Sequence, residues 1–203
     1  MVWDINKKLL FIHIPKTGGS TIEQHMNAFN NISKGYKRTK ENKAMQHFSI
    51  IEYNKLGQFD IINFYKFSIV RNPYTKILSE YYWTNLPMCY KDNRTFNYFL
   101  NAVEDIVKNK NYNYTFLHDH FIPQKDFITD EYNNIIIDKI FKFEEYNECI
   151  LFLKYYYPNI QPTIHNKINT SKDVNFRITL TTLQKKKIYE LYKDDFILFN
   201  YEE

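Results

Sequence analysis

The chain has 203 residues, a length that fits one domain and can bury a substantial core. Its formal net charge of +4 suits an acidic co-substrate or a polyanionic acceptor, and is too weak to indicate a nucleic-acid partner. No apolar run approaches the roughly 20 residues of a membrane helix, and no signal peptide is visible. We therefore expect a soluble protein, cytoplasmic if the chain is full-length. Cys89 and Cys149 lack metal-ligand spacing, and we expect free thiols.

The first predicted strand is an apolar, β-rich run over residues 9–14. Pro15 ends it, because proline has no N–H to donate to a central sheet. Gly18 and Gly19 then permit a tight turn close to a ligand. Apolar residues follow at helical spacing, at Ile22, Met26 and Phe29. A strand, a glycine turn and a helix in this order place free N–H groups at a helix N-terminus, which favours a bound anion.

The side chains of this turn also favour a phosphate, since Lys16 adds a cation and hydroxyls come from Thr17, Ser20 and Thr21. The order excludes a Walker A loop, in which the lysine follows the second glycine, and the Rossmann pattern is absent. Residues 15–21 resemble instead the 5′-phosphosulfate loop of carbohydrate sulfotransferases that use 3′-phosphoadenosine 5′-phosphosulfate (PAPS). The branch most similar contains the heparan sulfate 2-O- and 6-O-enzymes. The alternative is a glycine turn that only caps a helix.

A polar stretch over residues 31–46 carries five basic side chains and precedes His47. The stretch is either a solvated loop or a rim that meets an anionic acceptor. Histidine suits proton abstraction from a hydroxyl, since its unperturbed pKa of about 6.5 is close to working pH. The resemblance implies that His47 is the catalytic base. The alternative is a structural histidine.

Residues 63–70 predict a second buried strand that runs into Arg71. Asn72 can cap the following helix, and Pro73 suits its first turn. Arg71 would then lie at the carboxyl end of a strand, where open α/β sheets bind ligands. The segment resembles the family's 3′-phosphate site, which implies that Arg71 and Ser79 bind that phosphate. The alternative is a surface ion-pair residue beside an uninvolved serine.

A cluster of His118, Asp119 and His120 invites a metal interpretation. Two spaced histidines and one carboxylate are a weak zinc signature, and we predict no metal. Residues 120–124 instead resemble a recurring segment of the sulfotransferase family that lies near the acceptor.

The remaining predicted elements are an exposed helix over residues 95–109, a buried strand over 135–143, a helix opened by Glu144 and Glu145, and a last helix over 180–194. Residues 165–172 resemble the family's loop that closes over the adenosine and the 3′-phosphate, which implies contacts from Ser171 and Lys172. Two alignments of this loop stay open, one on residues 166–167 and one on residues 169–171.

Together these features predict a single α/β domain over residues 1–203, with a P-loop-NTPase-like, mainly parallel sheet and helices on both faces. The resemblance implies transfer of a sulfuryl group from PAPS to a hydroxyl of an acceptor, most readily a carbohydrate. The product nucleotide would be 3′-phosphoadenosine 5′-phosphate (PAP). Lys16 would neutralise charge on the leaving oxygen, while backbone N–H groups of Gly18 to Thr21 would hold the 5′-phosphate.

Two other functional classes stay open. One is a P-loop-like nucleotide kinase, against which the order of lysine and glycines argues. The other is a non-catalytic sulfotransferase-fold protein that binds a nucleotide or a glycan. A small metabolite, a lipid or a protein tyrosine also remains open as the acceptor, as do the oligomeric state and the compartment.

Overall fold

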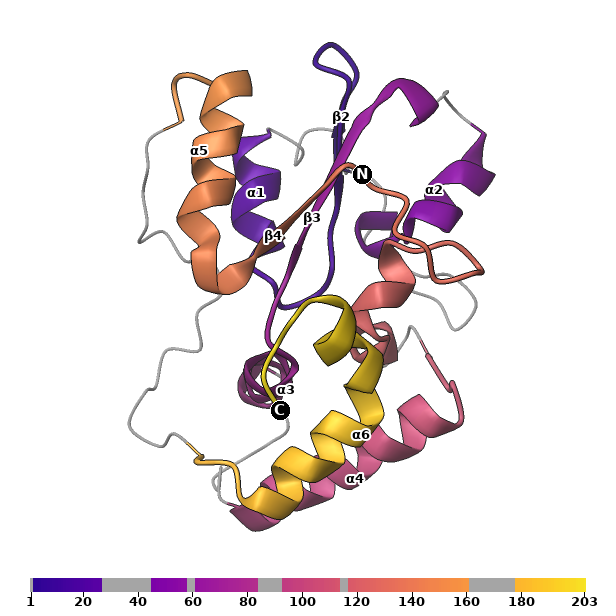
Figure 1. The fold of residues 1–203 in the computed structure, drawn as a ribbon, viewed down its shortest axis with the longest axis vertical. Helices are drawn as coiled ribbons and strands as arrows, with labels where there is room; N and C mark the ends of the chain where they lie inside the picture. Colours follow the sequence, from indigo (N-terminus) through magenta and orange to yellow (C-terminus); the bar gives the residue numbers. More distant parts are fainter. Residues whose placement is uncertain (1, 27–44, 58–60, 84–92, 114–116, 161–177) are drawn as a thin grey trace.

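A four-stranded sheet forms the centre of the computed structural model, which describes residues 2–26, 45–57, 61–83, 93–113, 117–160 and 178–203. The strand order is β1-β2-β3-β4, with β1 (Trp3–Asp4), β2 (Leu9–Ile12), β3 (Tyr65–Val70) and β4 (Lys139–Lys142). Strands β2, β3 and β4 run parallel, and β1 pairs antiparallel with β2 (Figure 1). The predicted mainly parallel α/β sheet is confirmed.

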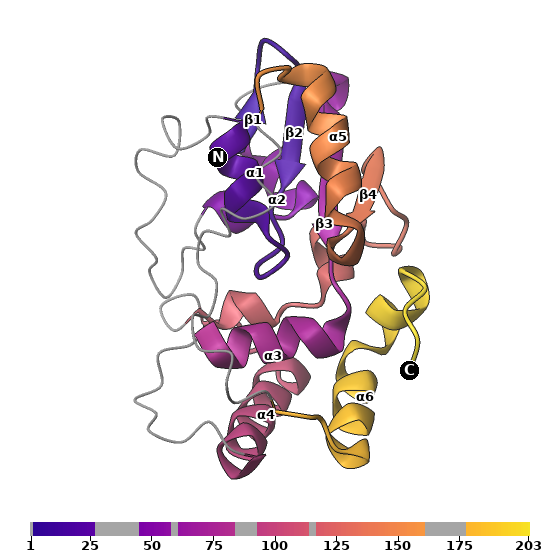
Figure 2. The ribbon, with the colours of Figure 1, turned by 90° about the vertical axis from the view of Figure 1, so that its left-hand side faces the viewer.

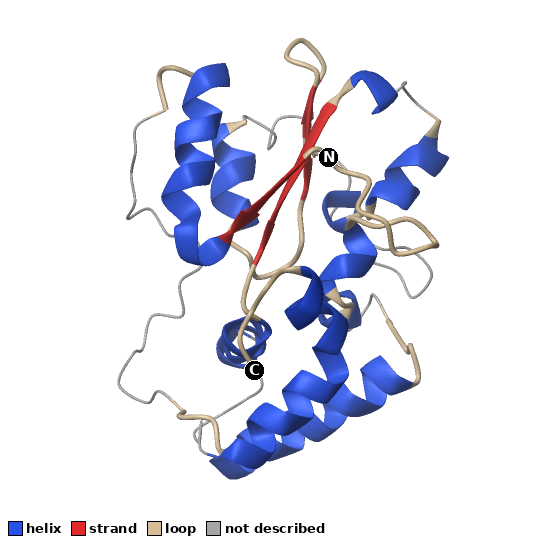
Figure 3. Ribbon diagram, viewed as in Figure 1, coloured by secondary structure: helices blue, strands red, loops and turns tan. Residues whose placement is uncertain are grey.

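Helices cover both faces of this sheet (Figure 3). On one face lie α1 (Gly19–His25) and α5 (Tyr146–Tyr156), and on the other lies α2 (Ile50–Leu56) (Figure 1). Alternate strand residues point to opposite faces, so each face has its own core. Phe11, Phe67 and Phe141 pack in the core with α1 and α5, whereas Leu10 and Val70 pack in the core with α2.

A third core lies beyond the carboxyl ends of the strands, where three helices pack together (Figure 2). They are α3 (Pro73–Trp83), α4 (Asn93–Lys108) and α6 (Thr182–Leu198). The prediction that residues 95–109 form an exposed helix is wrong for one of its faces. Phe96, Leu100 and Val103 are buried there, because α3 and α6 cover them. This third group of helices lies next to the carboxyl ends of β2 and β3 (Figure 2), where the candidate site is found.

The strands predicted over residues 9–14 and 63–70 are confirmed but shorter, since β2 ends at Ile12 and β3 begins at Tyr65. Two other predicted elements differ more. The strand expected over residues 135–143 is limited to β4, and Ile135 is 41% exposed in an isolated bridge with Thr129. Asp138 causes the break, because its carboxylate and its N–H both bond to the backbone of Lys66 just before the ladder begins. The last helix starts later and ends later than predicted, because a capping box between Thr181 and Gln184 sets its start.

Several local predictions are confirmed. Asn72 precedes α3, and its side-chain oxygen accepts the N–H of Tyr74 at 2.9 Å. Cys149 is a buried free thiol, while Cys89 and Phe29 lie outside the described residues. Among the helices described, none combines the length and the apolar character needed to cross a bilayer.

Candidate functional site

The loop between β2 and α1 is held mainly by its own backbone and by α5. Gly18 has a φ of 84°, and its carbonyl accepts both the N–H of Thr21 at 3.2 Å and the hydroxyl of Tyr146 at 2.8 Å. Thr17 is buried, and its hydroxyl donates to the carbonyl of Ile14 at 2.8 Å. This differs from the expectation that the Thr17 hydroxyl and the Thr21 N–H face a phosphate, because the proton of each is used inside the loop.

Arg71 joins the two predicted phosphate motifs. Its Nη1 donates to the backbone carbonyl of Lys16 at 3.1 Å, and its Nε donates to the hydroxyl of Thr75 at 3.0 Å. The guanidinium also lies 4.2 Å from the ring centroid of Phe143. Burial lowers the pKa of Arg71 to about 10, with Glu144 opposing the shift, so the group stays charged at neutral pH. The structure thus brings together Lys16 and Arg71, which are 55 positions apart.

Lys16 lies partly buried at the carboxyl edge of the sheet, with Nζ 4.6 Å from the ring centroid of Trp83. Burial lowers the pKa of Lys16 to about 8, and the positive charges of Arg71 and Lys76 act in the same direction. Glu80 opposes them. This is a concentration of cations in a site with little water, as an anionic ligand requires.

The other predicted donor-site residues are placed less directly. Ser20 is half-buried at the start of α1, and Ser79 is half-buried on α3, one position before Glu80. Ser171 and Lys172 lie outside the described residues, as does the basic stretch over residues 31–44. Their predicted roles stay predictions.

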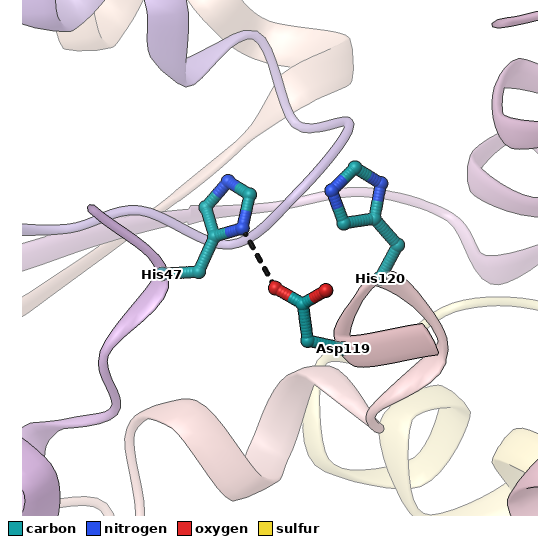
Figure 4. Close-up of side chains that lie close together, drawn as sticks. All are labelled: His47, Asp119 and His120. Carbon is teal, nitrogen blue, oxygen red and sulfur yellow. Dashed lines mark hydrogen bonds and ion pairs between the residues drawn. The ribbon is translucent and has the colours of Figure 1, made fainter. Parts of the chain in front are cut away.

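The predicted base, His47, lies in a short 3₁₀ helix (Met45–His47) and is buried. Its Nδ1 lies 3.0 Å from a carboxylate oxygen of Asp119, and its Nε2 lies 3.2 Å from the amide nitrogen of Gln46 (Figure 4). Burial holds the pKa of His47 well below its usual value, and Asp119 only partly offsets this. The imidazole is therefore neutral at pH 7 and able to accept a proton.

His47 is the middle member of a row of three buried histidines, each with Nδ1 against a carboxylate. The pairs are His13 with Glu23 at 2.6 Å, His47 with Asp119 at 3.0 Å, and His120 with Glu80 at 2.9 Å. The ring centroid of His47 lies 5.1 Å from that of His13 and 5.0 Å from that of His120. In a neutral imidazole, a carboxylate at Nδ1 holds the proton there and leaves the lone pair on Nε2.

The row connects the predicted base to the predicted leaving-group lysine. His120 stacks on Trp83 with centroids 5.1 Å apart, and Lys16 lies against the ring of Trp83. Among the described residues, a chain of ring contacts through His120 and Trp83 therefore links His47 to Lys16. Such an arrangement presents a proton acceptor and a cation to one small region, as a group transfer between an anionic donor and a hydroxyl requires.

Sequence reasoning missed several residues of this site. His13, Glu23, Glu80 and Trp83 belong to no motif that we used. The one available signal is on α3, where Lys76, Glu80 and Trp83 follow each other at i, i+4 and i+7 and so share one helix face.

Three side chains could hold a metal ion by their chemistry. One donor atom each from His47, Asp119 and His120 lies within 4.8 Å of the others, and nitrogen and carboxylate donors suit Zn²⁺. The cluster differs from the one considered in the sequence, because His118 is half-buried with Nδ1 3.2 Å from the carbonyl of Asn111, and His47 takes its place.

Replacement of Gly19 by alanine should lower stability by about 3 kcal/mol or more, the upper end for overpacking. A Cβ at Gly19 would lie 2.1 Å from Cδ2 of His13, and that ring is held by Glu23 and by stacking on Phe11. Gly57→Ala is the matched control, since a Cβ there meets nothing within 4 Å and only its φ of 59° carries a cost, roughly 1 kcal/mol. Thermal unfolding should therefore give a lower melting temperature for Gly19→Ala than for Gly57→Ala, and equal melting temperatures would contradict this prediction.

The fold and the site define a class: an α/β protein with a P-loop-like sheet that gathers cations and a neutral histidine at the carboxyl edge of its strands. A sequence profile described as the Sulfotransferase family matches residues 1–202. The chain therefore belongs to the Sulfotransferase family, and sulfuryl transfer to a hydroxyl-bearing acceptor is its general reaction. No curated protein and no solved structure matches it.

Proposed function

We propose that this protein transfers a sulfuryl group from PAPS to a hydroxyl of a carbohydrate. The contact between the Arg71 guanidinium and the Lys16 carbonyl carries this proposal. It unites the 5′-phosphosulfate motif and the 3′-phosphate motif at one edge of the sheet. A nucleotide with phosphates at both positions matches such a pair of cationic sites, whereas ADP and AMP lack the 3′-phosphate.

In the proposed donor site, the Lys16 ammonium, the N–H groups of Gly18 and Gly19, and the Ser20 hydroxyl face the 5′-phosphosulfate. Arg71 binds the 3′-phosphate as a fork of donors, with Ser79 as a neutral donor. On the part of the chain outside the described residues, Ser171 and Lys172 would close over the nucleotide. The site needs no metal for this chemistry, because its own donors and cations meet the charge of the phosphates.

In the proposed reaction, the acceptor oxygen attacks sulfur and forms the new O–S bond. The bond between sulfur and the bridging oxygen of the 5′-phosphate breaks, and PAP leaves. The hydroxyl proton passes to Nε2 of His47, while Asp119 holds the imidazole in orientation through Nδ1 and stabilises the resulting charge. Lys16 stabilises the negative charge that develops on the bridging oxygen. The acceptor hydroxyl would take the place that the Gln46 amide holds beside His47.

The carbohydrate acceptor is supported by the resemblance of residues 15–21 to the 2-O- and 6-O-branch and by the net positive charge of the chain. A screen with ³⁵S-labelled PAPS would use de-O-sulfated heparin, chondroitin, simple methyl glycosides and a tyrosine peptide. Labelled glycan supports the proposal. Label only on the peptide would contradict the acceptor class while keeping sulfuryl transfer. Tight PAP binding without product from any acceptor would favour a non-catalytic binding protein.

PAP should bind the purified protein with micromolar affinity in the presence of EDTA, and Arg71→Ala should weaken it roughly 10- to 100-fold. This is the effect of losing hydrogen bonds to a charged group, about 1.5–3 kcal/mol. Isothermal titration with PAP, ADP and AMP measures it. Thr75→Val is the matched control, because it removes the exposed partner of Arg71 Nε and leaves the guanidinium in place. Equal affinity for ADP and PAP, or binding only with Mg²⁺, would favour the kinase alternative.

Raising the pH from 7 to 9 should weaken PAP binding several-fold. The pKa of Lys16 is lowered to about 8 by burial, so the ammonium loses its charge across this interval while Arg71 keeps its own. Lys16→Arg should bind PAP with little pH dependence, because a guanidinium stays charged throughout. Titrations at three pH values measure this, and the same decline in both proteins would show that another group is responsible.

A further inference from the structure

His120 carries the one buried side-chain polar atom among the described residues for which the structure gives no hydrogen-bond partner. Its Nδ1 lies 2.9 and 3.0 Å from the two carboxylate oxygens of Glu80, whereas its Nε2 is buried and unpaired. The residue as a whole is only 4% exposed. Buried polar atoms are almost always paired, so an exception calls for a function.

Two contacts hold the imidazole of His120 in this orientation, and a third holds its backbone. Glu80 holds Nδ1, the ring stacks on Trp83 at an interplanar angle of 25°, and the backbone carbonyl accepts from Nζ of Lys76 at 2.6 Å. A ring fixed in this way cannot turn Nε2 toward another protein group without losing the other contacts. The site therefore keeps a nitrogen available for a ligand.

That nitrogen faces the predicted base. Figure 4 shows the ring edge of His120 that is remote from its Glu80-bound nitrogen turned toward His47 and Asp119. One ring nitrogen of His47, one of His120 and an oxygen of Asp119 all lie within 4.8 Å of one another. The ring centroids of His47 and His120 are 5.0 Å apart, so two adjacent polar groups at hydrogen-bond distances of about 2.7–3.2 Å can contact one histidine each.

The positions of the protons on His120 and on the acceptor decide what kind of ligand fits. With its Nδ1 proton donated to Glu80, an imidazole in the neutral form offers a lone pair at Nε2 and needs a donor there. The hydroxyl that is sulfated has one proton, and the proposed reaction gives it to His47. A second hydroxyl beside the first would supply the proton that His120 accepts.

We propose that His120 is an acceptor-binding residue, whose Nε2 accepts a hydrogen bond from a hydroxyl adjacent to the one that is sulfated. The site thereby selects vicinal diols, the arrangement found around a sugar ring. This inference rests on the proposed function and deepens it. Glu80 acts on the acceptor through His120 and is a positioning residue.

The test compares the sulfation of cis-1,2-cyclohexanediol with that of cyclohexanol by labelled PAPS, in full-length wild type and in two variants. His120→Asn keeps a donor for Glu80 and removes the group at Nε2, while His120→Gln places an amide near the Nε2 position. We expect wild type to favour the diol in kcat/KM roughly tenfold, the effect of one hydrogen bond to an otherwise unpaired group. The preference should vanish in His120→Asn and be retained in part by His120→Gln. PAP affinity should be unchanged in both.

The control is His118→Asn, since His118 is two positions away and lies outside the row of histidines. It should keep the wild-type preference. Equal rates for the diol and the monoalcohol in wild type would overturn the inference. Sulfation of tyrosine methyl ester but of neither cyclohexanol nor the diol would do the same, as would PAPS binding with no product from any probe. So would activity that EDTA abolishes and Zn²⁺ restores, because the cluster would then be a metal site. If wild type does not bind PAP at all, the proposed function itself is overturned.

Discussion

His47→Ala is expected to lower kcat for sulfuryl transfer roughly 10²- to 10⁴-fold, the usual contribution of a positioned general base. PAP affinity should change little, because His47 touches the acceptor rather than the nucleotide in the proposed site. Turnover at saturating PAPS, measured with labelled donor, gives kcat, and titration with PAP gives the affinity. Because Asp119 orients this imidazole through Nδ1, replacement of Asp119 by alanine should also lower kcat and leave PAP affinity nearly unchanged.

Two further observations make this result specific. His118→Ala should leave kcat unchanged, since Nδ1 of that histidine lies 3.2 Å from the carbonyl of Asn111 and His118 belongs to none of the three histidine–carboxylate pairs. The wild-type rate should not fall as the pH drops from 8 to 6.5, because burial holds the pKa of His47 well below its usual value. Protonation of Lys16, whose pKa is about 8, should raise the rate slightly over the same interval, and the decline due to His47 should come only below pH 6.5. A His47→Ala protein with PAPS bound and near-full turnover would show that another group takes the proton.

Lys16→Ala should lower kcat roughly 10²- to 10³-fold, about 3–4 kcal/mol of transition-state stabilisation. The charge that Lys16 meets is largest on the bridging oxygen as the O–S bond breaks, so the loss should appear in kcat more than in KM for PAPS. Single-turnover rates with labelled PAPS separate the two effects.

Lys16→Arg keeps the charge and should recover part of the rate, although a wider head group must fit against Trp83. Lys55→Ala, an exposed change at the end of α2, is the matched control for loss of a positive charge. A Lys16→Ala protein that binds PAP more weakly but turns over at the wild-type rate would place Lys16 in ground-state binding only.

The parts of the fold that could be predicted are those with a local cause. Strands β2 and β3 lie in the middle of the sheet and are buried along most of their length, so their largely apolar sequences placed them correctly to within two residues at one end of each. Strand β4 was predicted too long, because an apolar run does not reveal that Asp138 bonds to the backbone of Lys66. The buried face of α4 was missed for a similar reason, since its cover comes from α3 and α6.

The amino-acid sequence by itself predicted the donor side of the proposed site. Lys16 before two glycines, and Arg71 at the end of an apolar run, are short-range patterns whose backbone consequences follow from the residues themselves. Only the tertiary structure showed which carboxylate pairs with each histidine on the proposed acceptor side. His47 and Asp119 are 72 positions apart, and His120 and Glu80 are 40 apart, so no periodicity relates them. They meet because the parallel strands end at one edge and α3 packs beneath it, where burial both pairs each histidine with a carboxylate and keeps His47 neutral.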